Sequence, residues 1–134
     1  MKVHSQTDVG LVRTLNEDAC RTGLLGENGA WAVVCDGMGG ANGGEIASET
    51  AVKSIEEQIL ASYEEDFKSE EMKLMLSTLI FHANSAVYDM AQENESLKGM
   101  GTTIVVAIVL DNVAHIAHAG DSRAYWLHNG NIMQ

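Results

Sequence analysis

The sequence predicts an α+β domain in which helices pack on antiparallel sheet. Three observations carry this prediction. Short β-rich segments occupy the first third of the chain, two long segments with helical periodicity follow, and a β-rich meander comes last. The 134 residues suffice for one domain with an apolar core, and they contain no internal repeat or linker.

Three short strands are expected first, over residues 2–9, 19–25 and 31–36. Residues 2–9 alternate loosely between polar and apolar types, as a half-buried strand does. Residues 31–36 are apolar, with two valines at their centre, and run directly into an aspartate. Such a run is typical of a buried strand.

Two amphipathic helices are expected next, over residues 44–63 and 69–92, because apolar residues recur in both at intervals of three and four. Residues 43–98 hold twelve Asp and Glu residues and four Lys and Arg residues, so this stretch contributes −8 (four minus twelve) to the net charge of −11. We interpret this charge as the solvated outer face of the helices.

The composition then changes to β-branched residues. Strands are expected over 102–110, 113–120, 124–128 and 131–134. The dipeptides Asp111-Asn112 and Asn129-Gly130 separate them in pairs, and Asn-Gly strongly favours a type I′ hairpin turn. The last strand has an edge that needs cover, so we expect the chain to be the front part of a larger domain.

The composition also limits the classes of partner. A net charge of −11 argues against nucleic acid and anionic membrane surfaces. The sequence has no run of eighteen apolar residues and no apolar stretch of the kind found in a secretory signal. Cys20 and Cys35 are interpreted as reduced thiols, although the sequence alone leaves their pairing open. We therefore expect a cytoplasmic protein.

Asp36 and the glycines after it form the most informative segment. This carboxylate stands at the end of an apolar strand, where it is costly unless a positive charge holds it. Five glycines follow within eight residues: Gly37, Gly39, Gly40, Gly43 and Gly44. Glycine backbone can approach a ligand closely. The combination predicts a metal site that handles phosphate.

Four polar motifs fall at the ends of predicted strands, where their side chains can converge above a sheet. They are R-T-L-N-E-D at 13–18, D-G-M-G-G at 36–40, G-M-G-T-T at 99–103 and G-D-S-R at 120–123. Each alone has a structural interpretation, such as a surface turn, a turn before a helix or a local Asp–Arg pair. In this order and at this spacing they are far more specific.

Together the four motifs resemble the metal-dependent protein serine/threonine phosphatases of the PPM family (the type 2C phosphatases), bacterial branch. The resemblance covers the whole chain but only the N-terminal part of the family's single domain, so residues 1–134 would lack its C-terminal part. It implies a four-layer α/β/β/α sandwich of two antiparallel sheets flanked by helix pairs, truncated in this chain. It also implies hydrolysis of phosphoserine and phosphothreonine in proteins.

The resemblance gives roles to six residues. Arg13 matches the arginine that holds the substrate phosphate, for which a bidentate donor is well suited. Asp18 matches a carboxylate that orients metal-bound water. The metal ligands are matched by Glu17, by Asp36 as the bridge between two metals, by the carbonyl of Gly37, and by Asp121 at an additional, weaker site. The first helix and the G-M-G-T-T strand match scaffold.

The residue types agree with this chemistry. Carboxylate and carbonyl oxygens suit Mg²⁺ or Mn²⁺ rather than zinc, and two such ions can activate a shared water without a protein nucleophile. A cysteine phosphatase would need Cys-x5-Arg, but Ala41 and Gly26 stand where that arginine would follow Cys35 and Cys20. The Asp-x-Asp pattern of aspartyl-phosphate enzymes is absent as well.

The sequence departs from the family at two points. Some relatives carry a histidine as general acid after the Asp-Gly pair, and Met38 holds that place here, so the acid is expected to be water or another group. The family's remaining metal-binding aspartates would lie beyond Gln134. The isolated chain is therefore expected to be inactive or impaired, and the alternative is a non-catalytic fragment or interaction module.

A nucleotide-binding loop is a competing interpretation of the glycine segment. Residues 37–42 read G-M-G-G-A-N and lack the last glycine of G-x-G-x-x-G. The P-loop pattern fails too, because Gly44 is followed by Glu45 where a lysine is required. The phosphatase resemblance instead implies phosphorylated proteins as substrates and an opposing serine/threonine kinase. Oligomeric state is open, and exposed sheet edges would favour self-association.

Overall fold

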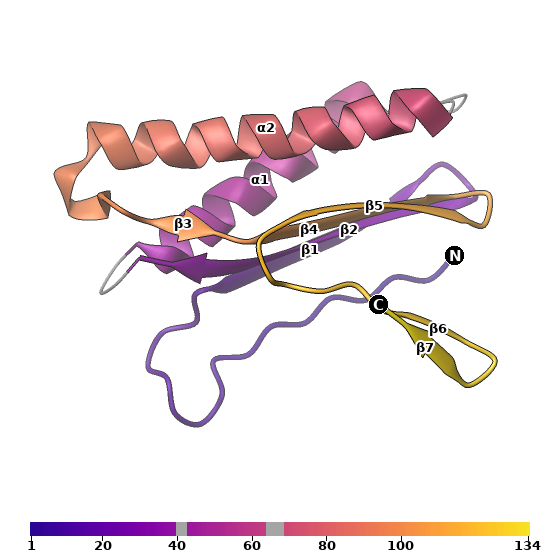
Figure 1. The fold of residues 1–134 in the computed structure, drawn as a ribbon, viewed down its shortest axis with the longest axis horizontal. Coiled ribbons are helices and arrows are strands. Elements are labelled where there is room, and N and C mark those ends of the chain that lie inside the picture. The colour runs from indigo at the N-terminus through magenta and orange to yellow at the C-terminus, as the bar shows by residue number, and fades with distance from the viewer. Residues whose placement is uncertain (40–42, 64–68) are drawn as a thin grey trace.

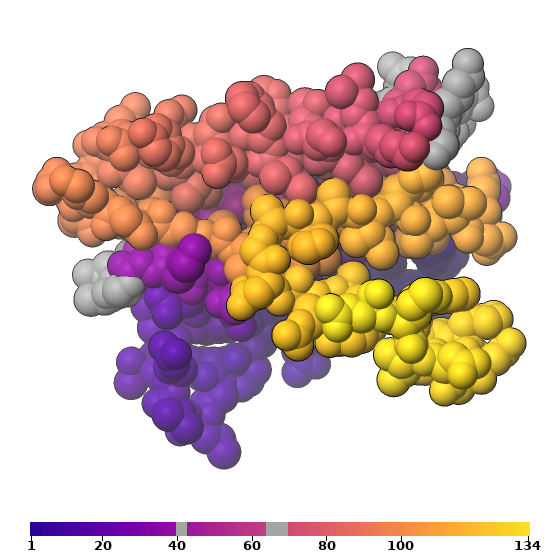
Figure 2. Space-filling view, viewed as in Figure 1, coloured from indigo at the N-terminus to yellow at the C-terminus, as the bar shows by residue number. Residues whose placement is uncertain are grey.

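The computed structural model describes residues 1–39, 43–63 and 69–134. Its elements are β1 (Asp18–Leu25), β2 (Gly29–Met38), α1 (Gly44–Ser62), α2 (Ser69–Glu93), the 3-10 helix η2 (Glu95–Leu97), β3 (Gly101–Thr102), β4 (Ile104–Leu110), β5 (Val113–Ala119), β6 (Trp126–His128) and β7 (Asn131–Met133). Figure 1 shows α1 and α2 over one face of a sheet, with the N-terminal segment and the β6–β7 hairpin on its other side. In the space-filling view the indigo N-terminal part and the yellow C-terminal hairpin form separate lobes on this side (Figure 2).

The main sheet has five strands and is antiparallel throughout. Its order is β1-β2-β4-β5, and the short β3 pairs with the end of β2. On β2, Val33 lies opposite both Arg21 of β1 and Val106 of β4, and Asp36 lies opposite Asp18 of β1. β6 and β7 form a separate two-stranded sheet.

The apolar core lies between the helices and the near face of the main sheet. Successive strand residues point to opposite faces, so this face takes every second residue. Val33, Cys35, Val106 and Ile108 are at most 1% exposed there, and Ile55 of α1 is fully buried against them. Most of the apolar stripe predicted for residues 44–63 therefore packs on the sheet, whereas Leu60, predicted to be part of it, is 63% exposed.

The far face of the same sheet is apolar but open. Leu24, Val34 and Ile116, from β1, β2 and β5, keep 57%, 48% and 49% of their surface exposed. Asp18 and Asp36 lie at the end of this face, beside the N-terminal segment. The sheet thus separates a packed apolar side from a side that carries carboxylates.

The predicted α+β fold with two antiparallel sheets is confirmed, and this chain contributes one of the two expected helix pairs. Both helices and six of the seven expected strands occur within about two residues of the predicted bounds. The strand predicted over residues 2–9 is wrong. Those residues pair with no strand in the described part of the chain, and extended backbone without a ladder partner is not a strand.

Both predicted two-residue turns are confirmed. Asp111 and Asn112 have φ of 46° and 67°, and Asn129 and Gly130 have φ of 49° and 77°. Left-handed dihedrals at both central residues define the type I′ turn, whose twist matches that of the flanking strands. Among the described residues, no helix combines the length and apolar character that a membrane crossing requires.

Candidate active site

A hollow of about 270 Å³ opens at the ends of β1 and β2, under the N-terminal segment. Its lining comprises Asp8, Val9, Arg13, Leu15, Asn16, Glu17, Asp18, Asp36 and Gly37. Five of the six predicted site residues therefore meet in one place. They come from the loop before β1, the start of β1 and the end of β2, which the antiparallel pairing brings together.

Asp18 and Asp36 are direct neighbours across the β1–β2 ladder. Partial burial raises the pKa of Asp18, and the charge of Asp36, a hydrogen bond with Asp36 and the charge of Glu17 raise it further. Carboxylates gathered in this way repel one another, and a divalent cation would relieve that repulsion.

The donor set fits such a cation in kind, because it consists of carboxylate and carbonyl oxygens. Within the described residues, however, no three His, Cys, Asp or Glu side chains gather into a group that could hold a metal ion. The carboxylates that the structure describes therefore match a metal site in the chemistry of their donors but do not by themselves make up a complete ligand set.

Arg13 supplies the positive charge at the rim. Its Nη1 lies 3.7 Å from Oε2 of Glu17, and its side chain is 77% exposed. An ion pair this open is weak and leaves most of the guanidinium in water. The donors of Arg13 are thus free to bind an anion that enters the hollow.

Gly37 and Gly44 let the start of α1 cross directly over the end of β2. A Cβ on Gly37 would collide with the carbonyl oxygen of Gly44, and one on Gly44 would collide with Oε1 of Glu17. The N–H of Gly37 also donates to the carbonyl of Glu17 at 3.0 Å. Glu17 consequently lies against the N-terminus of α1, where the helix dipole favours a carboxylate.

Asp121 is the sixth predicted residue, and the structure places it outside this hollow. It follows Gly120, whose φ is +98°, in the exposed turn after β5. Its neighbour Ser122 is the residue of this turn that is linked to Asp36. Ser122 Oγ lies 2.6 Å from Oγ1 of Thr103, and that same Oγ1 accepts a hydrogen bond from the Asp36 N–H. Asp121 therefore sits one residue from a hydrogen-bonded chain that ends at Asp36.

Sequence reasoning missed Asn16. Its Oδ1 accepts from the N–H of Asp18 at 3.1 Å, and its Nδ2 donates to Oγ1 of Thr7 at 2.8 Å. Asn16 thus connects the N-terminal segment to the first residue of β1. Asparagine two residues before a strand is a turn signal that could have found this contact.

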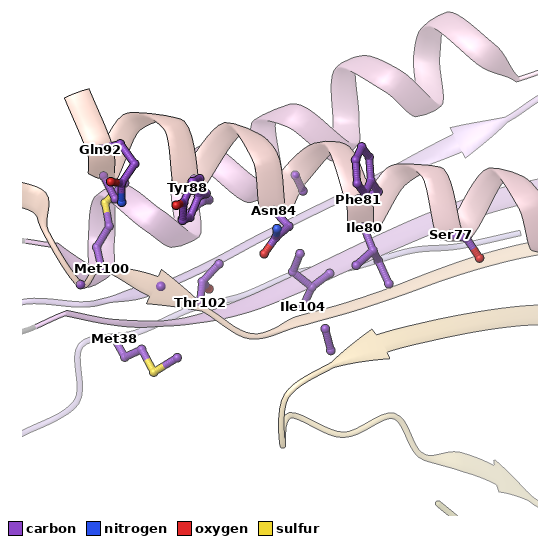
Figure 3. Close-up of a pocket in the computed structure, with 16 residues that line it drawn as sticks. Met38, Ser77, Ile80, Phe81, Asn84, Tyr88, Gln92, Met100, Thr102 and Ile104 are labelled. Atoms are coloured by element: carbon purple, nitrogen blue, oxygen red, sulfur yellow. The ribbon is translucent and has the colours of Figure 1, made fainter. Parts of the chain in front are cut away.

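A larger hollow of about 640 Å³ lies between α2 and the end of β3, and it is a different kind of site. Phe81, Asn84 and Tyr88 of α2 line it, and Figure 3 shows Asn84 pointing from the helix toward the side on which Thr102 and Met38 lie. No charged side chain of the described residues lines it. Met38 thus borders this apolar hollow and not the one that contains Asp36.

The cysteines take no part in the candidate site. Both are free, and burial raises the pKa of the Cys35 thiol to about 12, which leaves almost no thiolate at neutral pH. Gly40 and Ala41 of the glycine-rich segment lie outside the described residues.

A family model described as protein phosphatase 2C matches residues 12–134. The serine/threonine phosphatase stp of Listeria welshimeri is 34% identical over the whole chain, and PstP of Mycobacterium tuberculosis is 31% identical. The chain covers 53% of the first relative and 24% of the second. It thus spans about half the length of the Listeria protein.

Two solved phosphatase structures are also similar to this chain. Phosphatase Stp1 from Staphylococcus aureus superposes with a TM-score of 0.86 and 37% identity, over 96% of this chain and 51% of that one. The catalytic domain of PstP in complex with two manganese ions superposes with a TM-score of 0.77 and 32% identity, over 96% of this chain and 52% of that one. The chain therefore belongs to the protein phosphatase 2C family.

Proposed function

We propose that the protein hydrolyses phosphoserine and phosphothreonine in other proteins, with Mn²⁺ or Mg²⁺ as cofactor. The observation that carries the proposal is the pairing of Asp18 with Asp36 in one hollow, beside Glu17 and under the exposed guanidinium of Arg13. Oxygen donors for a hard cation and a bidentate donor for a phosphate face the same space. The relatives' names support the reaction.

In this proposal the metal ligands are Glu17, the bridging Asp36 and the carbonyl of Gly37, with Asp121 serving an additional, weaker site. When bound there, two such divalent ions would lower the pKa of a shared water and neutralise phosphate charge. The PstP structure with two manganese ions supports this number of ions. Zinc is disfavoured, because structural and catalytic zinc sites rely on cysteine and histidine.

The chain's own side chains have two further tasks. Arg13 binds the phosphate oxygens and holds the ester over the hollow. Asp18 accepts a hydrogen bond from the attacking water and so aims its lone pair at phosphorus. Met38 cannot donate a proton, so the leaving serine or threonine oxygen takes its proton from water or another group.

Residues 1–134 alone should be inactive or impaired. The described carboxylates do not complete a metal-binding group, and the Listeria welshimeri and Staphylococcus aureus relatives are about twice as long as this chain. The alternative for residues 1–134 by themselves is a non-catalytic role as an interaction module. For the protein at its natural length, we propose phosphorylated proteins as substrates, a serine/threonine kinase acting in opposition, and a cytoplasmic location that fits two reduced cysteines.

The test uses the protein at its natural length and a phosphothreonine peptide, assayed with Mn²⁺ and then with EDTA. Asp36→Asn should lower kcat by more than about 100-fold, because even outer-shell partners of metal ligands are worth about 10–100-fold. Asp89→Asn makes the same change at an exposed position on α2 and should leave the rate unchanged. Activity that survives EDTA, or survives Asp36→Asn, would overturn the metal-dependent reaction.

Arg13→Lys separates binding from chemistry in the same assay. Lysine keeps the charge and loses the planar fork, so KM for the peptide should rise about tenfold while kcat changes less. An unchanged KM would remove Arg13 from the phosphate-binding role.

A further inference from the structure

The main chain of Asp36 is held by two adjacent threonines, Thr102 at the end of β3 and Thr103 between β3 and β4. The Asp36 N–H donates to Oγ1 of Thr103 at 3.0 Å, and the Thr103 N–H donates to the Asp36 carbonyl at 2.9 Å. Oγ1 of Thr102 donates to the same carbonyl at 3.1 Å. Both polar groups of the Asp36 backbone are therefore fixed from one short segment.

One of these bonds is unusual for a ladder. Val34 pairs with Val105 and Gly37 with Thr102, so the same register places Asp36 opposite Thr103. Two residues opposite each other in a hydrogen-bonded antiparallel pair normally exchange two N–H···O=C bonds. Here the Thr103 hydroxyl takes the place of its carbonyl as the acceptor for Asp36.

The same hydroxyl reaches a second part of the site. Oγ1 of Thr103 lies 2.6 Å from Oγ of Ser122, which follows Asp121 in the chain. Gly120 packs so closely on Thr103 that a Cβ there would lie 2.7 Å from Cγ2. Thr103 itself is buried, at 9% exposure. It thus joins the strand end that carries Asp36 to the turn that carries Asp121.

We propose that Thr103 is a positioning residue for the metal centre, with its hydroxyl fixing the backbone of Asp36 and coupling it to the Asp121 turn. This proposal rests on the proposed function. An exposed carboxylate on a loosely held backbone samples many directions, whereas a ligand whose N–H and C=O are both bound presents its oxygens in one direction. The G-M-G-T-T segment, expected from the sequence to be scaffold, therefore includes a residue that orients the site.

The test compares four variants of the protein at its natural length: Thr103→Val, Thr103→Ser, Ser122→Ala and Thr22→Val. Valine keeps the shape of threonine and removes the hydroxyl, and serine keeps the hydroxyl. Thr22→Val makes the same change on β1, away from the hollow. The readouts are amide hydrogen exchange at Asp36 without metal, Mn²⁺ affinity by calorimetry, and kcat at saturating Mn²⁺.

Thr103→Val should speed exchange of the Asp36 amide and weaken Mn²⁺ binding by about 10–100-fold, the range found for residues that orient metal ligands. Thr103→Ser and Thr22→Val should both stay within about threefold of the native protein, as judged against that range. Ser122→Ala should leave the Asp36 amide protected and weaken only the weaker of the bound ions. Native Mn²⁺ affinity in Thr103→Val, or equal losses in Thr103→Ser, would overturn the proposal.

If Thr103→Val does not fold, the Thr103→Ser and Ser122→Ala variants still test the proposed role of Thr103. Rescue by serine together with a selective loss in Ser122→Ala supports the role, and native metal affinity in Ser122→Ala contradicts the coupling. Failure of the proposed function has a different signature. In that case the native protein itself would show no Mn²⁺ binding and no effect of EDTA, whereas failure of this inference leaves both intact.

Discussion

The two faces of the main sheet are built from the same kinds of residue and serve different ends. On the face under the helices, Val33 and Ile108 are at most 1% exposed. On the other face, Val34 and Ile116 keep about half of their surface in water, at 48% and 49%. The carboxylates Asp18 and Asp36 stand at the end of this open face.

This difference separates stability from chemistry. Burial of apolar area stabilises the helix-covered face, because each fully buried aliphatic side chain contributes about 1.5–3 kcal/mol. The paired carboxylates on the open face lower the free energy of unfolding, because the repulsion between like charges at short range favours the unfolded chain. The burial of the core on one side of the sheet thus offsets the repulsion between the carboxylates on the other side.

The largest predicted effect is the difference in stability between the same isoleucine-to-alanine substitution made on each face of the sheet. In the 134-residue chain, Ile108→Ala removes a fully buried side chain and should lower the free energy of unfolding by about 2–5 kcal/mol. Ile116→Ala, on the next strand, should cost only about 1 kcal/mol, because half of the side chain is already in water. Urea denaturation measures both.

Equal losses in the free energy of unfolding for Ile108→Ala and Ile116→Ala would contradict the distinction between the faces. The same two variants made in a longer chain would test it further. A cost at Ile116 that rises toward the cost at Ile108 would show that additional residues cover the open face.

A smaller effect is expected where β2 and α1 cross. Gly37→Ala forces a Cβ against the backbone of Gly44 and should lower the free energy of unfolding by about 1–3 kcal/mol. Gly101→Ala on the paired strand β3 is the control. Its Cβ would lie 3.3 Å from Cε of the exposed Met38, which can move, so a change within about 0.5 kcal/mol is expected. Thermal unfolding that ranks Gly101→Ala as the more harmful change would contradict the crossing.

The smallest effect, with the opposite sign, should come from Asp18. Partial burial and the neighbouring charge of Asp36 raise the pKa of Asp18 in the folded chain. The folded state therefore holds this proton more tightly than the unfolded state, and the stability it contributes is lost as pH rises through the folded pKa. Asp18→Asn should raise the Tm of the metal-free chain slightly at pH 7.

The pH dependence provides the control for this prediction. Below the unfolded pKa, near the ordinary value of 3.8, both states are protonated and the native and Asp18→Asn chains should melt together. A gain that persists at pH 3, or a lower Tm at pH 7, would mean that the Asp18 carboxylate is not repelled in the folded chain.

Elements whose signal is local could be predicted from the sequence. The helices were visible as three- and four-residue spacing, and the two tight turns as Asp111-Asn112 and Asn129-Gly130, because the residues that decide them are neighbours in the chain. Residues 2–9 show the limit. Their alternation suits a strand, but a strand exists only with a partner, and periodicity does not reveal partners.

The candidate site divides in the same way. The resemblance placed Arg13, Glu17, Asp18 and Asp36 in one site, and these residues line one hollow. The link from Asp36 through Thr103 to the turn at 120–123 was not visible, because it depends on strand register and on a side chain that replaces a carbonyl. The two contacts of this link join residues 67 and 19 positions apart, and contacts at such separations carry no periodic signal.

The crossing of Gly37 and Gly44 ties the candidate site to the helix layer. Their contact holds the end of β2, one residue after Asp36, against the first residue of α1. The same helix is anchored in the core by the fully buried Ile55. A substitution that shifts α1 in the core should therefore also displace the backbone beside Asp36, although it lies on the opposite side of the sheet from the carboxylate.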